Sequence, residues 1–476
     1  MLIWLVLACG TEKNEDTASE EVETNEEADT DEEVDTGEEV DTDEPTDEFS
    51  NHYSFENADG ESSVSYSGQV CRQVLINDIK AYISDLDSRI STEVVIPDEV
   101  LNGLGFYFET AASVGDDVEH SFNTDIDALQ QTYGAISSGK NLIGKIAGND
   151  SATDHKDWSR DFRGWGVDSG SPLSLVEDWF MQLDEQALNW GNLPLNVLGE
   201  SIDHVYLTPE GQDLKQLIEK FLRASVSFSQ GTDDYLDDDV EGKGLLASHI
   251  PEEGKKYSPL EHAWDEGFGY FGAARTYPQW TDDEIADLGY QDVDGSGTID
   301  LLSEVNWGHS VNAAKRDRGV EGVDFTADAW EGFIRGRELL SKTVGTELTE
   351  SELEELKVYR DQAVWAWEAA IAATSIHYIN DMHQDLAEFG TEDFSFSTTA
   401  KHFSELKGFS LSFQFNPRSA VSDSSFQTFH DLIGTAPNFN SVESYRADLE
   451  EAKQIIGDSF GFDASYLGDE NGEDGW

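Results

Sequence analysis

The residues from 292 to 304 have the types and the spacing of a calcium-binding loop. Oxygen-bearing side chains stand at every second position, as in the loop of an EF-hand, where they surround a hard cation. Gly297 stands where that loop turns sharply, and the closing glutamate comes one position late, after Ser303. The sequence therefore predicts an EF-hand-like calcium site, with a plain Asp/Gly turn as the alternative. The expected ligands are Asp292, Asp294, Ser296, Thr298, Asp300 and Glu304.

Two His-x-x-acid pairs and one further histidine are candidates for a transition-metal site. His402 and Glu405 are three residues apart, so on a helix they share a face, and the same holds for His262 and Asp265. Such pairs put an imidazole and a carboxylate into a bundle core, where they bind iron, zinc or copper, or simply hold each other by a hydrogen bond. The predicted metal-binding residues are His262, Asp265, Glu266, His377, His402 and Glu405.

The N-terminal residues have the pattern of a lipoprotein signal peptide. An apolar run ends in Val6, Leu7, Ala8 and Cys9, and the cysteine of this pattern receives the lipid. The run is too short to span a bilayer, which needs about 20 apolar residues. We therefore expect residues 1–9 to be a signal peptide ending in a lipidated Cys9. The protein would then be extracytoplasmic, periplasmic or at the cell surface, and anchored to a membrane. The alternative is a cytosolic protein with a short apolar N-terminus.

Residues 10–50 form an acidic segment of low complexity. The segment carries 20 of the 99 Asp and Glu residues, and it repeats Glu-Glu-Val-Asp-Thr at 32–36 and 38–42. Because so few apolar side chains cannot offset the entropy of ordering a chain, we expect a disordered tether between the membrane and a folded domain.

The formal net charge of −70 limits the choice of partners. Most acidic residues lie after the tether, so the folded part is strongly acidic itself. Such a charge disfavours nucleic acid and anionic lipid surfaces and favours cations, and a saline habitat would explain it equally well. Cys71 is the only cysteine besides Cys9. If Cys9 carries a lipid, no internal disulfide can form, and histidines and carboxylates must hold any transition metal.

The spacing of apolar residues after residue 50 predicts a mainly α fold. The most regular stripe, with steps of three and four, runs from Leu353 to Asp381 behind a capping box of Thr349 and Glu352. A weak internal repeat places a long helix and a polar turn before each His-x-x-acid pair, and this indicates two related helical bundles at 51–320 and 321–476. Long loops are expected at 136–170, 229–257 and 289–300, and a short β-rich patch near 92–108.

Several strings of residues resemble those of a known family. His402-Phe-Ser-Glu405 resembles the His-x-x-Glu signature of the imelysins, helical lipoproteins built as two bundles and linked to iron uptake. The segments 231–239, 262–271, 312–317 and 402–409 are similar to those of an uncharacterised imelysin-like family of bacterial lipoproteins. The resemblance implies a metal site at His402 and Glu405. Imelysins carry a glycine two residues before the histidine, whereas Ala400 and Leu260 stand at those positions in this chain.

Together these features predict an imelysin-like extracytoplasmic lipoprotein that binds a transition metal, with iron favoured, for uptake or handling, and that holds calcium as a structural ion. Besides the membrane, an outer-membrane receptor or a redox protein is the expected partner. One alternative is a metal-dependent hydrolase, which needs a metal with an open position for water and a base beside it. The other is a calcium-stabilised interaction protein without metal chemistry. A binding role is favoured over an enzymatic one.

Overall fold

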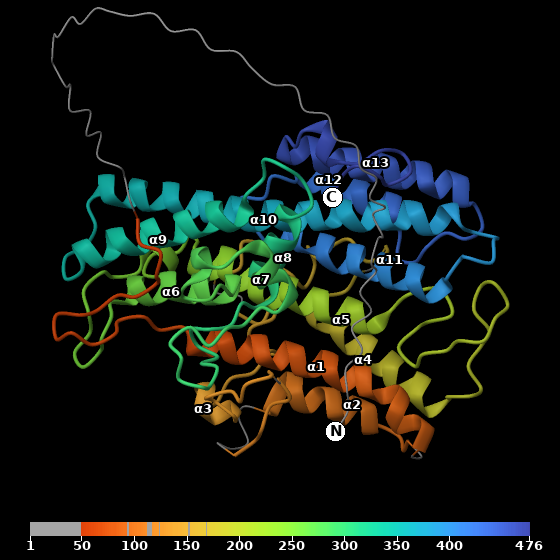
Figure 1. Ribbon diagram of the computed structural model, residues 1–476, viewed down its shortest axis with the longest axis horizontal. Coiled ribbons are helices and arrows are strands. Elements are labelled where there is room, and N and C mark those ends of the chain that lie inside the picture. The colour runs from red at the N-terminus through yellow and green to blue at the C-terminus, as the bar shows by residue number, and fades with distance from the viewer. Residues whose placement is uncertain (1–48, 93–94, 112–116, 123, 151–152, 168) are drawn as a thin grey trace, which may run out of the picture. The chain divides into compact units, whose positions relative to one another are not determined.

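A helix of 38 residues, α10 (Glu350–Ala387), runs through the computed structural model (Figure 1). Its predicted capping box is confirmed, because the Thr349 hydroxyl accepts from the Glu352 N–H while the Glu352 carboxylate accepts from the Thr349 N–H. Leu356, Ala363 and Trp367 on its predicted stripe are buried. The apolar period therefore located both the helix and the face that packs in the core.

The structure describes residues 49–476 except 93–94, 112–116, 123, 151–152 and 168. Within these residues the chain forms helices, short turns of 3₁₀ or π type and isolated β-bridges, so the predicted mainly α fold is confirmed. No helix in this part of the chain is long and apolar enough to cross a membrane. Cys9 and nearly all of the expected tether lie outside the described residues.

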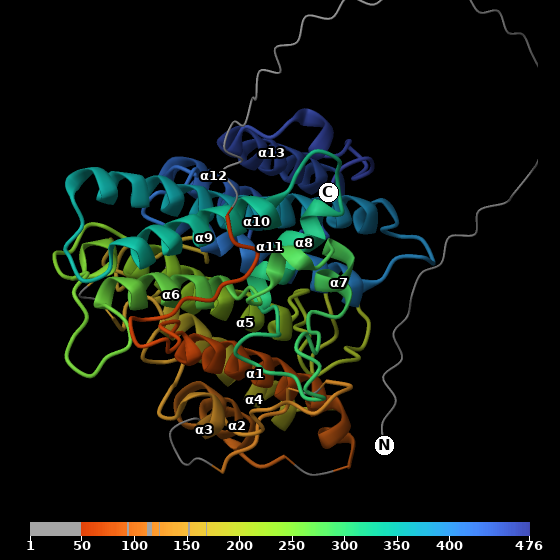
Figure 2. The same cartoon turned by 60° about the vertical axis from the view of Figure 1, so that its left-hand side comes forward.

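Among the described residues, four helices have the most extensive packing on α10. Figures 1 and 2 show α9 and α11 running alongside it, one nearer each end. The helices are α8 (Gly308–Asp317), α9 (Phe325–Thr343), α11 (Phe396–Ser410) and α13 (Val442–Phe460).

The remaining helices form layers below and beside this group (Figure 1). They are α1 (Ser67–Thr92), α2 (Glu99–Gly105), α3 (Tyr133–Ser137), α4 (Pro172–Leu188), α5 (Leu214–Leu222), α6 (Pro259–Phe271), α7 (Asp282–Asp287) and α12 (Asp423–Ile433). The π-type turns are η1 (Phe106–Thr110), η2 (Arg223–Phe228) and η3 (Gln230–Tyr235), and the 3₁₀ turns are η4 (Gly244–Leu246), η5 (Tyr277–Gln279), η6 (Leu411–Gln414) and η7 (Ala464–Tyr466).

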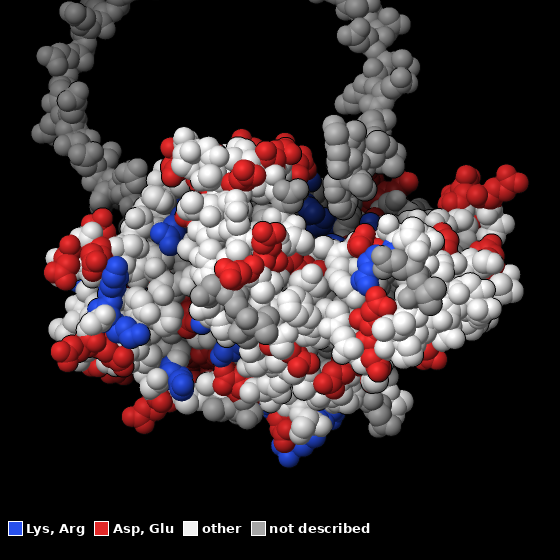
Figure 3. Space-filling view, turned by 90° about the horizontal axis from the view of Figure 1, so that it is seen from below, with Lys and Arg blue, Asp and Glu red and all other residues white. Residues whose placement is uncertain are grey.

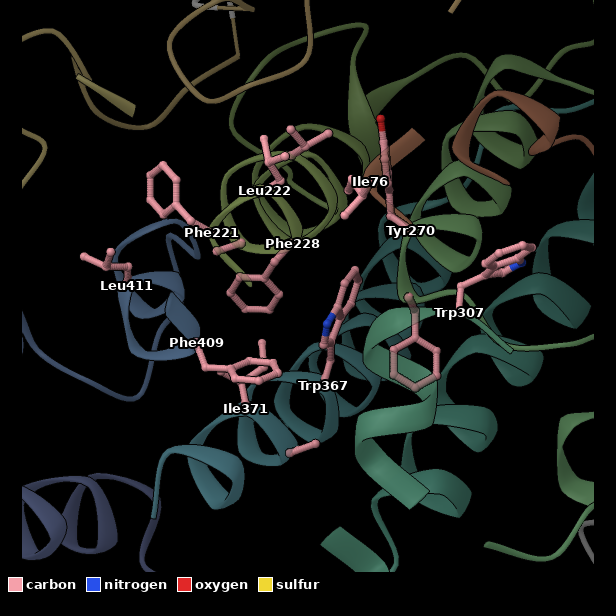
Figure 4. Packing of buried hydrophobic residues seen from close by; sticks show 14 of the residues in the cluster. Ile76, Phe221, Leu222, Phe228, Tyr270, Trp307, Trp367, Ile371, Phe409 and Leu411 are labelled. Carbon is pink, nitrogen blue, oxygen red and sulfur yellow. The ribbon is translucent and has the colours of Figure 1, made fainter. Parts of the chain in front are cut away.

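Aromatic side chains join these layers into one core. Trp367 of α10 meets Phe228 of η2 edge-on, with ring centroids 5.2 Å apart, and Phe271 of α6 at 5.5 Å (Figure 4). All three side chains are fully buried. Large rings of this kind dominate the apolar surface that a core removes from water. Trp367 therefore connects helices from both halves of the sequence.

The two halves expected at 51–320 and 321–476 meet within a single compact unit, Phe49–Trp476. Helix α11 of the second half packs on α5 of the first, and α10 packs on α8. The relation of the halves as two similar bundles stays a prediction.

One local expectation is wrong, and a second is wrong only at its start. The β-rich patch near 92–108 is occupied by α2 and η1, and Asp184 of α4 fixes the start of α2 by accepting from the N–H groups of Val100 and Leu101. The expected loop at 229–257 opens with η3, whose Thr232 hydroxyl donates to the Phe228 carbonyl. In both places, partners from other helices or burial override the local composition.

Candidate calcium site and histidine clusters

Three carboxylates converge in the predicted calcium loop. Asp292, Asp294 and Glu304 each offer an oxygen within 4.8 Å of the others. Among the described residues, no other set of three histidine, cysteine, aspartate or glutamate side chains converges in this way. Glu304 is buried and Asp294 is exposed, so the group lies at the surface with one side open to solvent.

The backbone of the loop holds the first two carboxylates in place. Asp292 accepts from the N–H groups of Ser296 and Gly297, both at 2.9 Å, and Asp294 accepts from Ser296 at 2.8 Å. Gly295 and Gly297 have φ angles of 70° and 82°, in the left-handed region that side chains with a Cβ rarely adopt. The hydrogen bonds from Ser296 also lower the pKa of Asp294 and keep this group ionised.

Glu304 reaches back into the loop although it stands one position late. One of its oxygens accepts from the N–H groups of Val293 and Asp294, at 2.8 and 3.2 Å, and the other accepts from that of Asp300 at 2.8 Å. The one-residue displacement from the EF-hand spacing therefore does not remove the closing carboxylate from the site.

The other three predicted ligands stabilise the loop itself. The Ser296 hydroxyl is hydrogen-bonded to Thr298 at 3.1 Å. Asp300 accepts from the Gln130 side-chain amide at 2.7 Å and from the Leu302 N–H at 3.0 Å. The structure thus brings together three of the six predicted positions and gives Ser296, Thr298 and Asp300 bonds within the loop and to its neighbour.

The loop is also tied to the rest of the domain. Ile299 forms a parallel bridge with Ala128, through bonds of 3.0 Å to the Asp127 carbonyl and 2.8 Å from the Leu129 N–H. Its two arms pair with each other where Tyr290 lies opposite Val305 in an antiparallel bridge. An ion in the loop would therefore hold together segments that are far apart in the sequence.

The two residues of the first His-x-x-acid pair, His262 and Asp265, contact different neighbours. Asp265 is fully buried and accepts from the Tyr53 hydroxyl, at 2.8 Å, and from the Arg337 guanidinium, at 2.9 Å. His262 points elsewhere, with Nδ1 2.9 Å from the Ser65 carbonyl and Nε2 3.7 Å from Glu266. His262 and Glu266 line a separate cavity of about 240 Å³. The structure therefore brings His262 to Glu266 and engages Asp265 in an internal ion pair.

His402 and Glu405, the second pair, also contact different neighbours. His402 Nδ1 lies 2.9 Å from Asp385, and its Nε2 lies 3.7 Å from Asp381. The same Asp381 oxygen lies 3.4 Å from His377 Nε2, so the two histidines share one carboxylate of α10. Glu405 instead lies 3.7 Å from the Lys220 ammonium.

The two histidines differ in charge. Burial and the nearby Arg316 lower the pKa of His377 to about 3, so this ring is neutral. Burial also acts against a charge on His402, but the hydrogen bond to Asp385 and the charge of Asp381 outweigh it and raise its pKa. His377 is therefore the better metal ligand of the two at neutral pH, since a ligating imidazole must be unprotonated.

Residues 191–463, more than half of the chain, match the model of a family described as a domain of unknown function (DUF4856). The chain belongs to this family. No curated protein and no solved structure matches it. The DUF4856 region contains every predicted calcium and transition-metal ligand, whereas Cys9 lies outside it.

Three acidic or basic partners in these clusters were missed as site residues by sequence reasoning. Asp381 was noticed only as part of the α10 stripe, although its place four residues after His377 puts the two on one face. Asp385 follows one turn later on the same face. Arg337 carries no local signal for its contact with Asp265, because the two residues belong to different helices of the DUF4856 region.

Proposed function

We propose that the chain is a lipid-anchored extracytoplasmic binding protein. One bound calcium ion stabilises the folded state of its helical domain. The observation that carries this proposal is the convergence of Asp292, Asp294 and Glu304 within 4.8 Å. Among the described residues, no lysine, arginine or histidine forms an ion pair with any of the three. The site has the charge and the oxygen ligands that calcium prefers, and main-chain carbonyls and water can fill its remaining positions.

The anchoring part of the proposal rests on the sequence. Cys9 after an apolar run supplies the lipid attachment, and residues 10–50 supply the tether. The resemblance to imelysin-like lipoproteins supports the same location. An outer-membrane receptor or a redox protein would be the partner of the tethered domain.

A second candidate function is the binding of iron or another transition metal at the histidine cluster of α10 and α11. It is favoured by one observation: His377 and His402 approach the same Asp381 oxygen, at 3.4 and 3.7 Å. Imidazole and carboxylate are suitable ligands for iron, zinc and copper. Metal analysis of the purified protein, compared with a His377→Ala, His402→Ala variant, would test it. Equal metal content in the two proteins would remove this candidate.

The test of calcium binding is thermal melting of the full chain in calcium, in magnesium and in a chelator. An ion that binds only the folded state stabilises it by about 3 kcal/mol at a hundredfold excess over its Kd. We expect the melting temperature to fall in chelator and to recover with calcium, and to recover less with magnesium, which demands a smaller octahedral site.

The matched variants are Asp292→Asn, Asp294→Asn and a control, Glu252→Gln, Glu253→Gln. The control also removes two negative charges, from an exposed stretch outside the loop. The control should respond to calcium as the natural chain does, and the loop variant should not respond. A calcium response that survives in the loop variant would overturn the proposal.

A further inference from the structure

A cavity of about 350 Å³ lies beside the calcium loop, among helices from both halves of the domain. Its walls come from α1, α5, η2, α7, α8, α10 and α11, and from the chain on either side of the calcium loop. Leu288 and Gly289 precede that loop, and Val305 to Gly308 follow it. Neither predicted His-x-x-acid pair accounts for this cavity, since only Glu405 of those residues reaches it.

The charge of the cavity is opposite to the charge of the chain. The protein has 29 basic and 99 acidic residues, and acidic side chains are more frequent than basic ones on the face in Figure 3. The wall of the cavity, in contrast, contains more basic side chains than acidic ones. The basic ones are Lys80, Lys220, Arg223, Lys315 and Arg316, and the acidic ones are Glu219 and Glu405.

Both acidic groups are already paired with three of these cations. Glu219 lies 2.7 Å from the ammonium groups of Lys80 and Lys220 and 2.9 Å from the guanidinium of Arg223. These cations lower the pKa of Glu219 well below its usual value, although burial acts in the other direction. Glu405 lies 3.7 Å from Lys220. The other Glu405 oxygen is buried without a hydrogen bond. Neither acidic side chain of the wall forms an ion pair with Lys315 or Arg316 among the described residues.

Arg316 is a buried cation that the carboxylates of Asp381 and Glu405 attract without forming an ion pair with it. Only 9% of the residue is exposed, and its Nε is buried without a hydrogen bond. Among the described residues, no side chain forms an ion pair or a hydrogen bond with its guanidinium. Lys315, next to it, lines the cavity and is exposed to solvent, and it has no ion pair in the described part of the chain. Because a buried charge is costly unless it is paired, an anion bound beside the Arg316 guanidinium would stabilise the domain.

The structure assigns a packing or capping role to the other residues of the segment 312–317, but not to the side chains of Lys315 and Arg316. In the string Asn312–Asp317, Asn312 donates to the Thr374 hydroxyl of α10 at 2.7 Å. Asp317 accepts from the N–H groups at the start of α9, at 2.7 Å from Phe325. The alanines between them are buried. Lys315 and Arg316 are the members of the string that no packing or capping role explains.

Part of the cavity wall is apolar, beside the polar side chains of Asn77, Asn306, Asn312 and Tyr378. It contains the rings of Phe122, Trp307 and Phe409 and the aliphatic side chains of Ile285, Leu288 and Val311. A cavity of this size that combines a few polar groups with an apolar wall is typical of small-molecule sites. An inorganic ion would leave this wall without a contact, whereas an organic anion would cover it.

We propose that this cavity binds a small organic anion, a carboxylate or a phosphate ester with an apolar part, whose charge is held by Arg316 and Lys315. A guanidinium binds either kind of anion by two parallel hydrogen bonds. The apolar part of the ligand lies against Phe122, Trp307 and Phe409. This proposal stands independently of calcium binding, because all of the groups that carry it lie outside the loop.

The test compares anions with neutral molecules of the same shape by calorimetric titration of the full chain. The probes are phenyl phosphate and phenylacetate, with phenol and phenylacetamide as neutral counterparts. At least one anion should bind, and its neutral counterpart should bind at least tenfold more weakly. Whichever of the two anions binds more tightly shows whether the natural ligand is a phosphate ester or a carboxylate.

The variants Arg316→Gln and Lys315→Gln should each weaken binding of that anion by about tenfold or more, the effect of losing a charge-assisted hydrogen bond. The control Lys342→Gln removes an exposed ammonium on α9 that does not line the cavity, and it should leave binding unchanged. Since Lys315 is open to the cavity, its variant folds even if the Arg316 variant does not. Equal binding of anion and neutral counterpart, or unchanged binding in both variants, would overturn the proposal.

Discussion

Two buried arginines in this domain have opposite surroundings. The guanidinium of Arg337, on α9, donates to Asp265 at 2.9 Å, to Glu261 at 2.8 Å and to Ser63 at 2.9 Å. The guanidinium of Arg316, on α8, has no such partner among the described residues, although the residue is also buried. The same side chain is thus neutralised from within the fold at one place and not at the other.

The comparison shows how to distinguish charged residues that are paired within the fold from charged residues that are available to bind a ligand in a very acidic protein. Asp265 belonged to a predicted metal site, but the fold supplies it with its own cation. Asp292 and Asp294 lie together with Glu304 and receive hydrogen bonds from the loop but no ion pair with a cation of the described residues. Charges that the fold leaves unpaired, of either sign, mark the places where a ligand is expected.

The largest effect should come from removing the paired arginine. Arg337→Met would leave Asp265 and Glu261 buried without their cation, which costs about 3–5 kcal/mol of the free energy of unfolding. Arg316→Met, in the absence of an anion, should change it by less than about 1 kcal/mol, or increase it, because an uncompensated charge is removed. Chemical denaturation of the two variants measures the difference. Equal losses would show that Arg316 is also held by the fold.

An intermediate case is Glu368, a buried carboxyl that neutral groups hold. It accepts from the Asn416 amide and the Ala420 N–H, and burial raises its pKa to about 7. Because this pKa is raised above the unfolded value, the stability that Glu368 contributes is full below about pH 4 and is lost as the pH rises to 7. The Glu368→Gln variant is always neutral. Between pH 5 and pH 7.5 its free energy of unfolding should therefore rise by about 1–3 kcal/mol relative to that of the natural chain. Parallel stability curves for the two proteins would contradict this assignment.

The two proposed sites should also influence each other. Val305 and Asn306 line the anion cavity and directly follow Glu304, and Asn306 N–H donates to Gly289, on the other arm of the loop, at 2.7 Å. Calcium should therefore strengthen binding of the anionic probe by about fivefold or more, and the probe should strengthen calcium binding by the same factor. Titrations in calcium and in chelator measure this coupling. If affinities are equal in both, the loop does not order the cavity wall.

The smallest expected effect is a pH dependence of anion binding. Desolvation by the cavity wall, with the charges of Lys220 and Arg316, lowers the pKa of Lys315 to about 8, although the residue is open to solvent on one side. The free site thus loses this charge as the pH rises through 8, and the affinity for the anion should fall by about threefold to tenfold between pH 7 and pH 9. The other charged or titratable groups of the wall are Lys80, Glu219, Lys220, Arg223, Arg316, Tyr378 and Glu405. The Lys315→Arg variant should remove most of the fall, and a fall of the same size in that variant would assign it to another group of the wall.

Features that depend on neighbours in the sequence were predictable. The capping box at Thr349 and Glu352, the buried stripe of α10 and the convergence of Asp292 with Asp294 all follow from spacing within a few turns or one loop. Even the late Glu304 reaches the site, because the backbone N–H groups of the loop draw its carboxylate inward.

Features that depend on distant helices were not predictable. His402 and Glu405 do share a helix, but Asp385 of α10 takes the histidine and Lys220 of α5 takes the glutamate. No spacing rule shows which helices meet. Likewise, Arg316 stands in a string that was noticed for its resemblance to other proteins, while the absence of a partner for it is set by the helices around α8.

The most direct test of the account is the number of calcium ions bound per chain, measured by equilibrium dialysis for the natural protein and for the Asp292→Asn, Asp294→Asn variant. Measuring the difference between the two cancels any weak binding by the acidic residues 10–50. The account predicts that the variant binds one calcium ion fewer per chain and that the lost ion is the tightest one. Identical binding curves for the two proteins would contradict it.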